Sequence, residues 1–431
     1  MTIVAVMLVL VYLIFVPKIE KRDIFSVQNI MFFFLLYLVI GSKLAYPEID
    51  IKVESSIPYI SLWLVGIIGT FIGFKLVKTE IGFKNLKSKT SFIKPILFEF
   101  RSRTLLFFTV SHLLLCLFIF YLKITRLGLT PISYFIQGAL LDHISNYLAE
   151  DTLVENALGR ITFLFYPFSI IYFERCLKGK KFLFNIFIFL FFIILPVVLI
   201  SATRMGILLS ILFWVVYRHY YVKRLSIVKL VFFAFTFMIL LVSLNSLRGG
   251  LGEQNSGVDN EFVRYTMRKD LSPVFAQDLL YESISSGKKD YEYGKDIYMF
   301  FLSFVPRAFW LEKPLTSFEP RMTVELIGEI GHEHGVLTFI NWAVGYSQFG
   351  IIGAFLYSVA YGYVLILLVR YIRLLFNSKL FEFYCVFLFS VGIRASIQFP
   401  IFMFFSFFLL PCILAIFKGI SNNLRRVDAL S

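Results

Sequence analysis

Long apolar stretches separated by short polar ones run through most of this sequence. A helix needs about 20 mostly apolar residues to cross the hydrocarbon core of a bilayer, and most of the stretches approach that length. The pattern predicts eleven spans, at 2–16, 27–42, 58–75, 104–122, 158–173, 182–200, 203–217, 227–246, 345–369, 381–398 and 400–418. The predicted fold class is therefore an all-α polytopic integral membrane protein.

The spans divide the chain into three parts. Residues 1–246 hold the first eight spans, 247–344 form one large loop, and 345–431 hold the last three spans and a polar tail. The loop is longer than a connection requires, and loops of that kind commonly carry function. We therefore expect the chemistry to lie in this loop and at the ends of the spans beside it.

The large loop has a hydrophobic pattern of its own. It predicts one helix from Glu261 and a second near 273–286. An apolar run from Asp296 to Val305 is too short to cross a bilayer and is soon followed by Trp310. Such a segment is typical of a helix in the membrane interface or of a re-entrant helix. The loop is therefore expected to lie along the membrane surface.

The composition agrees with a membrane protein. Of the 431 residues, 58% are hydrophobic and 16% are charged, and 53 are Phe. A soluble domain carries about 25% charged residues, and so many Phe side chains could not be buried in one aqueous core. The four cysteines have neither the spacing of a disulfide framework nor that of a metal site.

The distribution of lysine and arginine among the loops predicts how the chain is oriented in the membrane. In the short loops, 25 basic residues fall on one side of the predicted membrane and 7 on the other. The positive-inside rule places the richer side in the cytoplasm, so the C-terminus is expected inside, and the N-terminus and the large loop outside. The net charge of +14 follows from this asymmetry and favours anionic lipid, not nucleic acid, as its partner.

Several arginines stand at the outer ends of predicted spans. Arg204 and Arg394 are embedded in apolar sequence, Arg248 follows the span before the large loop, and Arg160 is taken as structural. A charge at that depth is normally paired or functional, and no acid lies within reach along either helix to neutralise Arg204 or Arg394. The pattern favours an anionic ligand, because guanidinium groups bind phosphate bidentately. The alternative is that these side chains only extend to the lipid head groups.

The loop also holds the sequence's one close pair of histidines, His332 and His334. An H-x-H pair without further ligands is weak as a metal site, so no metal and no cofactor are predicted. A single histidine acting as general base toward a sugar hydroxyl is the better use of this pair. The signatures of α/β-hydrolases, zinc proteases and P-loop NTPases are missing from the sequence.

Taken in order, the loop motifs resemble those of the Wzy-type polysaccharide polymerases, which build O-antigen, capsule and enterobacterial common antigen. The residues that carry the resemblance are Ala202-Thr203-Arg204, Arg248, Arg268-Lys269-Asp270-Leu271-Ser272-Pro273, Val305-Pro306-Arg307 with Trp310, Lys313 and Pro314, and the His-Gly stretch leading to Gly345. The resemblance covers roughly residues 190–400, and the order of the motifs is most similar to that of the common antigen polymerase.

The resemblance implies a GT-C-like glycosyltransferase architecture in a bacterial inner membrane. It also implies a periplasmic reaction in which a growing glycan leaves undecaprenyl diphosphate and joins a repeat unit held on the same carrier. Partners would be the lipid-linked donor and acceptor, membrane lipid, and a membrane protein that regulates chain length. Arginines would then stabilise the charge of the leaving diphosphate.

Residue roles follow from the same resemblance. Arg204, Arg248 and Arg394 are expected to bind the diphosphate, and either His334 or His332 to act as base. The further residues expected to contact diphosphate or sugar are Arg268, Arg307 and Lys313. Two alternatives stay open: an O-antigen ligase, which would use the same donor, and a flippase, which would be expected to show internal repeats and charges near the membrane midplane.

Overall fold

In the computed structural model, every secondary-structure element of the described residues is helical. The structure describes residues 2–15, 26–45, 57–77, 102–134, 158, 162, 165–166, 168–174, 189–196, 199, 212–222, 225, 272–303, 310, 314–315, 318–328, 337–376 and 379–391. The prediction of an all-α chain is confirmed over this part. The predicted spans 227–246 and 400–418, and the helix expected from Glu261, lie outside it.

The chain divides into two structural units. The first comprises Met1–Phe83, Ser256–Val369 and Val386–Ile401, and the second comprises Lys84–Asn255, Arg370–Cys385 and Phe402–Ser431. The first unit therefore joins the N-terminal helices to most of the large loop and to the helix that follows the loop.

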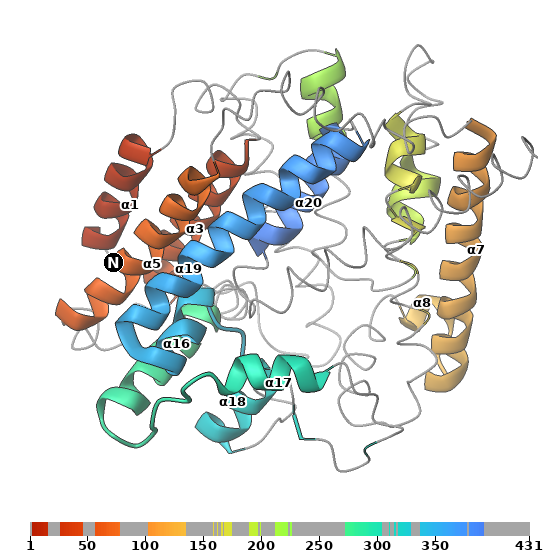
Figure 1. Cartoon of the computed structure of the whole chain (residues 1–431). Helices are drawn as coiled ribbons and strands as arrows, with labels where there is room; N and C mark the ends of the chain where they lie inside the picture. The colour runs from red at the N-terminus through yellow and green to blue at the C-terminus, as the bar shows by residue number, and fades with distance from the viewer. Residues whose placement is uncertain are drawn as a thin grey trace, which may run out of the picture. The chain divides into compact units, whose positions relative to one another are not determined.

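Three helices begin the first unit and lie side by side in Figure 1. They are α1 (Thr2–Phe15), α3 (Val27–Ala45) and α5 (Ile57–Leu76), and α1 contacts both of the others. Proline is tolerated in the first turn of a helix, and Pro58 occupies that position in α5. Predicted spans 2–16, 27–42 and 58–75 are thus helical within a few residues of their expected ends.

Helix α5 packs closely against α19 (Asn341–Phe376) through glycine. A Cβ atom placed on Gly69 would lie 2.8 Å from Cβ of Ser358, and one on Gly73 would meet the backbone of α19 at Val359 and Tyr363. Gly69 and Gly73 are four residues apart, the spacing that lets two membrane helices approach at the backbone. Side chains larger than hydrogen are therefore excluded from this seam.

Helix α19 is interrupted near its N-terminal end. Phe349 has φ −143° and ψ 27°, and Gly350 has φ 64° and ψ −150°, so the chain leaves the helical conformation between Gln348 and Ile351. Glycine tolerates a positive φ that strains other residues. The apolar pattern predicts one uninterrupted span at 345–369 and gives no sign of this break.

The loop contributes three helices to the first unit: α16 (Ser272–Ser285), α17 (Lys295–Ser303) and α18 (Phe318–Ile327). The predicted helix at 273–286 corresponds closely to α16. The described part of the apolar run expected at Asp296–Val305, which ends at Ser303, belongs to α17. In Figure 1 these helices lie near the N-terminal end of α19.

The second unit contains α7 (Ser102–Leu127), the short α8 (Pro131–Ser133), the π-helical turns η4 (Leu190–Ile194) and η5 (Arg218–Val222), and the N-terminal part of α20 (Lys379–Val391). The Oγ1 atom of Thr130 caps α8 by accepting a hydrogen bond from the backbone N–H of Ser133 (3.2 Å). Such caps satisfy one of the free N–H groups at a helix start.

Three helices are long and apolar enough to cross a membrane: Ile57–Leu76, Thr104–Leu127 and Asn341–Arg370. Two shorter apolar helices, Val4–Phe15 and Val27–Val39, fall below the same length. These findings concern the described residues alone, and they agree with a membrane protein.

Candidate functional site

The residues assigned to the site from sequence all lie outside the described part of the chain. They are Arg204, Arg248, Arg268, Arg307, Lys313, His332, His334 and Arg394. Their roles remain predictions. The structure describes part of the scaffold of the large loop, in which six of them are found.

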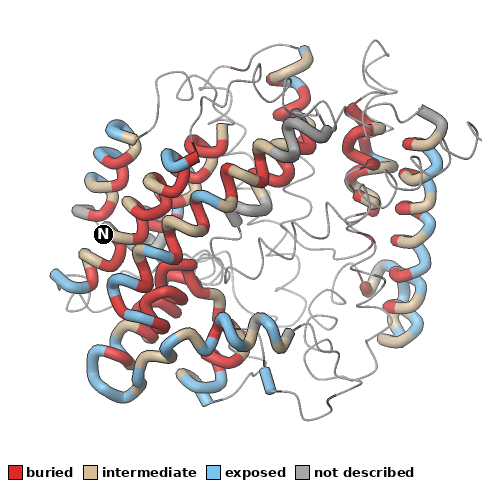
Figure 2. Tube along the Cα trace, viewed as in Figure 1, coloured by how far each residue is buried: buried red, intermediate tan, exposed pale blue. Residues whose placement is uncertain are grey.

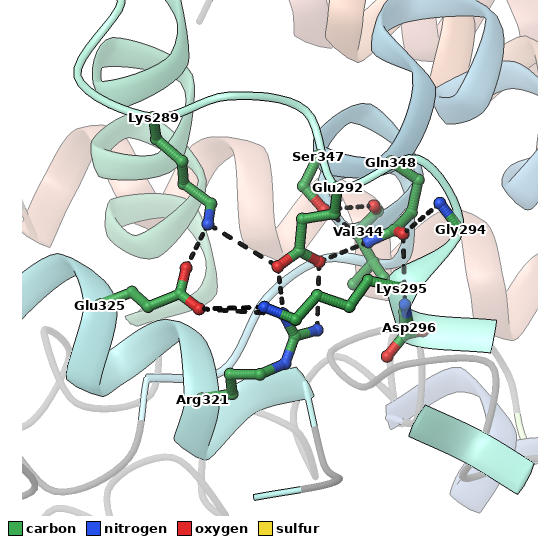
Figure 3. Close-up of polar contacts among 10 residues, drawn as sticks. All are labelled: Lys289, Glu292, Gly294, Lys295, Asp296, Arg321, Glu325, Val344, Ser347 and Gln348. Atoms are coloured by element: carbon green, nitrogen blue, oxygen red, sulfur yellow. Dashed lines mark hydrogen bonds and ion pairs between the residues drawn. The ribbon is translucent and has the colours of Figure 1, made fainter. Parts of the chain in front are cut away.

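A buried ion pair links two parts of that loop (Figure 3). Arg321 of α18 donates from both terminal nitrogens to Glu292, which lies between α16 and α17; the Nη2–Oε2 distance is 3.1 Å. Their side chains are only 8% and 4% exposed. A guanidinium group that meets a carboxylate with two parallel bonds fixes orientation as well as distance. The pair therefore holds α18 against the segment that leads into α17.

Further charges surround this pair. Lys289 forms an ion pair with Glu325 of α18, and its Nζ lies 3.7 Å from Glu292. Lys295 also approaches Glu325, at 3.9 Å. Cations and carboxylates thus alternate across the cluster, and the charges of Lys289 and Arg321 are compensated within the protein.

Gln348 connects the cluster to α19. Its Nε2 donates to Glu292 Oε2 (2.7 Å), while its Oε1 accepts from the backbone N–H of Gly294 (3.0 Å) and of Asp296 (3.3 Å). These two N–H groups belong to the start of α17, where a helix leaves its donors without partners. One fully buried glutamine therefore caps α17 and binds the ion pair. We call Lys289, Glu292, Asp296, Arg321, Glu325 and Gln348 the Glu292 cluster.

The two central carboxyl groups are shifted in opposite directions, although burial acts on both in the same way. Burial by itself would raise the pKa of Glu292, but the hydrogen bonds and charge of Arg321, with Gln348 and Lys289, outweigh it and lower that pKa. The pKa of Asp296 is instead raised to about 7, by burial first and by the charges of Glu319 and Glu292, against the opposing effect of Arg321. A carboxyl group that changes charge near neutral pH is thus built into the first turn of α17.

A second polar network joins α5, α16 and α19 in the same unit. Tyr59 donates to Asp278, Gln277 Nε2 donates to the Tyr59 hydroxyl (3.4 Å), and Trp342 Nε1 donates to Gln277 Oε1 (2.8 Å). All four side chains are buried. Buried polar groups are stabilising when they are hydrogen-bonded to one another, so this network anchors α16 to two candidate membrane helices.

Three large side chains of α17 lie on the surface. Ile297, Tyr298 and Phe301 are 47%, 60% and 65% exposed, and Trp310 beyond the helix is 38% exposed. Figure 2 shows the contrast with α16, which is largely buried. A helix with Asp296 of its first turn inside and with Ile297, Tyr298 and Phe301 outside is suited to the membrane interface that the sequence predicted for it.

The residues of the Glu292 cluster are not among the site residues that the sequence predicts. The spacing of Lys289, Glu292 and Lys295 places alternating charges three residues apart, which is the one local signal available. Their partners Arg321 and Gln348 are far away in the sequence, and no periodic pattern connects them.

Within the described residues, no three His, Cys, Asp or Glu side chains are grouped as a metal site requires. The expectation that no metal takes part therefore remains a prediction.

Comparisons of this chain with protein-family models, with curated proteins and with solved structures gave no match.

Proposed function

We propose that this protein is a polysaccharide polymerase of the bacterial inner membrane. It transfers a growing glycan from undecaprenyl diphosphate to the non-reducing end of a repeat unit on the same lipid carrier. The proposal includes eleven membrane spans, a GT-C-like architecture and a periplasmic location for the large loop. It rests on the order of the loop motifs in the sequence and on the surface of α17.

The exposed face of α17 is the observation that carries the proposal. A lipid-linked donor keeps its diphosphate at the membrane surface, so a catalytic loop must be held at that depth. Ile297, Tyr298 and Phe301 give α17 an apolar face suited to the interface, while the buried Glu292–Arg321 pair holds the helix to its neighbours. A rigid loop at the lipid surface supports chemistry on a lipid diphosphate.

The proposed step is a displacement at the anomeric carbon of the donor sugar. The acceptor hydroxyl oxygen forms a bond to that carbon as the bond from the carbon to the diphosphate oxygen breaks. Lipid diphosphate leaves with the electron pair, and Arg204, Arg248 and Arg394 stabilise its charge. His334 or His332 accepts the hydroxyl proton. Arg268, Arg307 and Lys313 bind the sugars or the diphosphate.

The Glu292 cluster serves this step indirectly. Its charges are paired within the protein, so it offers a frame and not an anion site. Arg307, Lys313, His332 and His334 all lie in sequence between α17 and α19, the two helices that Gln348 connects. Fixing both ends of that segment limits the positions that its side chains can take, as preorganised catalysis requires.

The experiment uses a strain in which the gene is deleted and then complemented. Wild type is compared with Arg204→Ala, Arg248→Ala and Arg394→Ala, and Arg160→Ala serves as the matched control at the same membrane boundary. Each variant is checked for its amount in the membrane. The expected result is that the three variants fail to restore the polymer ladder, while Arg160→Ala restores it.

The deletion strain itself separates the candidate functions. A single repeat unit attached to its final acceptor supports a polymerase. Long chains left on the lipid carrier would identify a ligase, and repeat units retained on the cytoplasmic side would identify a flippase. Full activity in all three arginine variants would refute the proposed diphosphate site.

A further inference from the structure

Asp296 is a carboxyl group placed where its charge is disfavoured. It lies in the first turn of α17, where an exposed carboxylate would be stabilised by the free N–H groups of the helix start, but its side chain is fully buried. The carboxyl groups of Glu292 and Glu319 act on it, and so does Arg321, which already donates two hydrogen bonds to Glu292. A proton on Asp296 therefore removes an excess of negative charge around one guanidinium group.

The other groups near Asp296 come from three different elements. Tyr357 of α19, beyond the break, faces the Asp296 carboxyl group with an uncharged hydroxyl. Lys289 of the connection before α17 and Lys295 of α17 both approach Glu325 of α18. The charge at Asp296 is therefore governed chiefly by the two carboxyl groups and the arginine named above.

The contacts of α17 with the rest of the described loop gather at its first turn (Figure 3). Gln348 Oε1 accepts hydrogen bonds from the backbone N–H groups of Gly294 and Asp296. The contact of Lys295 with Glu325, at 3.9 Å, joins two partly exposed side chains, and such pairs contribute little. Beyond this turn the large side chains of the helix are exposed. The first turn therefore decides whether α17 stays docked.

The backbone just before α17 has the conformation of a hinge. Tyr293 has a φ of +45° and is, among the described residues, the one non-glycine residue with a positive φ; Gly294 follows with a φ of 90°. Such strain in a side-chain-bearing residue is relieved when the chain turns. Glu292 is instead fixed, by Arg321 and by its backbone N–H, which donates to the carbonyl of Ser347 (2.8 Å). A change in the direction of α17 would therefore occur at residues 293–294.

We propose that Asp296 is a proton-controlled switch for the docking of α17. When Asp296 is neutral, the first turn stays inside the Glu292 cluster. When its O–H bond breaks and the proton passes to water, the new carboxylate is repelled by Glu292 and Glu319 and gains hydration by leaving, so α17 turns outward at Tyr293. The raised pKa of Asp296, about 7, places this change near neutral pH. The inference concerns the loop alone and does not depend on the proposed function.

Amide hydrogen exchange tests the switch. It is measured by mass spectrometry on the full-length protein in detergent from about pH 5 to about pH 8, corrected for the intrinsic effect of pH on exchange. Opening of α17 releases one proton from wild type, so its opening constant should rise by about tenfold per pH unit and level off above about pH 7. Asp296→Asn should show no such rise, and peptides of α16 should change little.

Asp290→Asn is the matched control, because Asp290 is an exposed carboxylate in the connection before α17 and should leave the wild-type pH dependence unchanged. Glu319→Gln removes one of the charges that act on Asp296, so the rise should level off at a lower pH. This variant also tests the switch if Asp296→Asn does not fold.

Three results would overturn the switch. The first is exchange of α17 in wild type that does not depend on pH after correction. The second is the wild-type rise in Asp296→Asn, or levelling-off at an unchanged pH in Glu319→Gln. The third is an equal rise in α16 and α17, which would mean that the proton acts on the whole structural unit and not on the docking of one helix.

Discussion

Arg321 of α18 meets Glu292 with two hydrogen bonds at a place where both side chains are almost fully buried. The two residues belong to different segments of the large loop, and Gln348 of α19 donates to the same carboxylate. Three segments that are distant in sequence are therefore joined at one carboxyl group.

Removing one member of this pair should destabilise the first structural unit strongly. Arg321→Ala leaves a carboxylate buried without its partner, and breaking a buried pair in this way costs about 3–5 kcal/mol. The measurement is thermal unfolding of the detergent-solubilised protein. Glu325→Ala is the control, because Glu325 is about one third exposed and partly exposed ion pairs contribute little. Equal melting temperatures for Arg321→Ala and Glu325→Ala would contradict the prediction.

The stability of the folded protein should depend on pH through Asp296. The direction is opposite to that given by a carboxyl group whose pKa is lowered on folding. Its folded-state pKa of about 7 lies above the usual 3.8, so the folded state binds the proton more tightly. The stabilisation is complete below the usual pKa and is lost as the pH rises to about 7, a change of roughly 4 kcal/mol. Asp296→Asn should remove this dependence.

The measurement is the melting temperature of the protein in detergent between pH 5 and pH 8, about the window in which Asp296 loses its proton. Wild type should lose stability as the pH rises from 5 to about 7 and change little above it, and Asp296→Asn should lose less over the same range. Parallel curves for the two proteins would show that Asp296 does not titrate in this range.

The glycine seam between α5 and α19 should not tolerate a larger side chain. Gly73→Val would place methyl groups against the α19 backbone at Val359 and Tyr363. Overpacking of this kind costs about 1–3 kcal/mol, and more where backbone must move. The expected result is a smaller amount of folded protein in the membrane, measured by monodisperse yield after solubilisation. Leu76→Val is the comparison, since it also places a valine on α5, but at a position where the side chain is 57% exposed.

The surface of α17 should contact lipid. A fluorescent label on Tyr298→Cys, in protein reconstituted into vesicles, is expected to be quenched by lipids that carry a nitroxide near the head group. A label on Lys288→Cys should be quenched less, because Lys288 lies in the charged connection before α17. Similar quenching at the two positions would remove the support that α17 gives to the proposed function.

Hydrophobic pattern predicted the helices well and their contacts poorly. The range 273–286 matched α16, and the apolar run after Asp296 matched α17, because both patterns depend on neighbours in sequence. The pairing of Glu292 with Arg321 depends on how the loop folds back on itself, which no local pattern records. The break at Gly350 was missed for a similar reason, since glycine is common inside membrane helices.

The candidate site also has a part that the sequence predicts and a part that only the structure reveals. Arg204, Arg248 and Arg394 were singled out because a charge in apolar sequence is conspicuous, and their roles stay predictions. Asp296 was read simply as the start of an apolar run. Its raised pKa arises from burial and from the carboxylates of Glu319 and Glu292, and these appear only in three dimensions.

The interruption of α19 alters where the large loop ends. The hydropathy pattern predicts that the loop ends at residue 344. The carbonyl groups of Ser347 and Gln348 nevertheless accept hydrogen bonds from the loop backbone. Residues up to Gln348 are thus tied to the loop, and the helix beyond Gly350 is joined to them by two non-helical residues. Gly345 before the break also packs closely against Gly353 beyond it, so the loop is coupled through this short segment to the long helix, and a shift of one would be transmitted to the other.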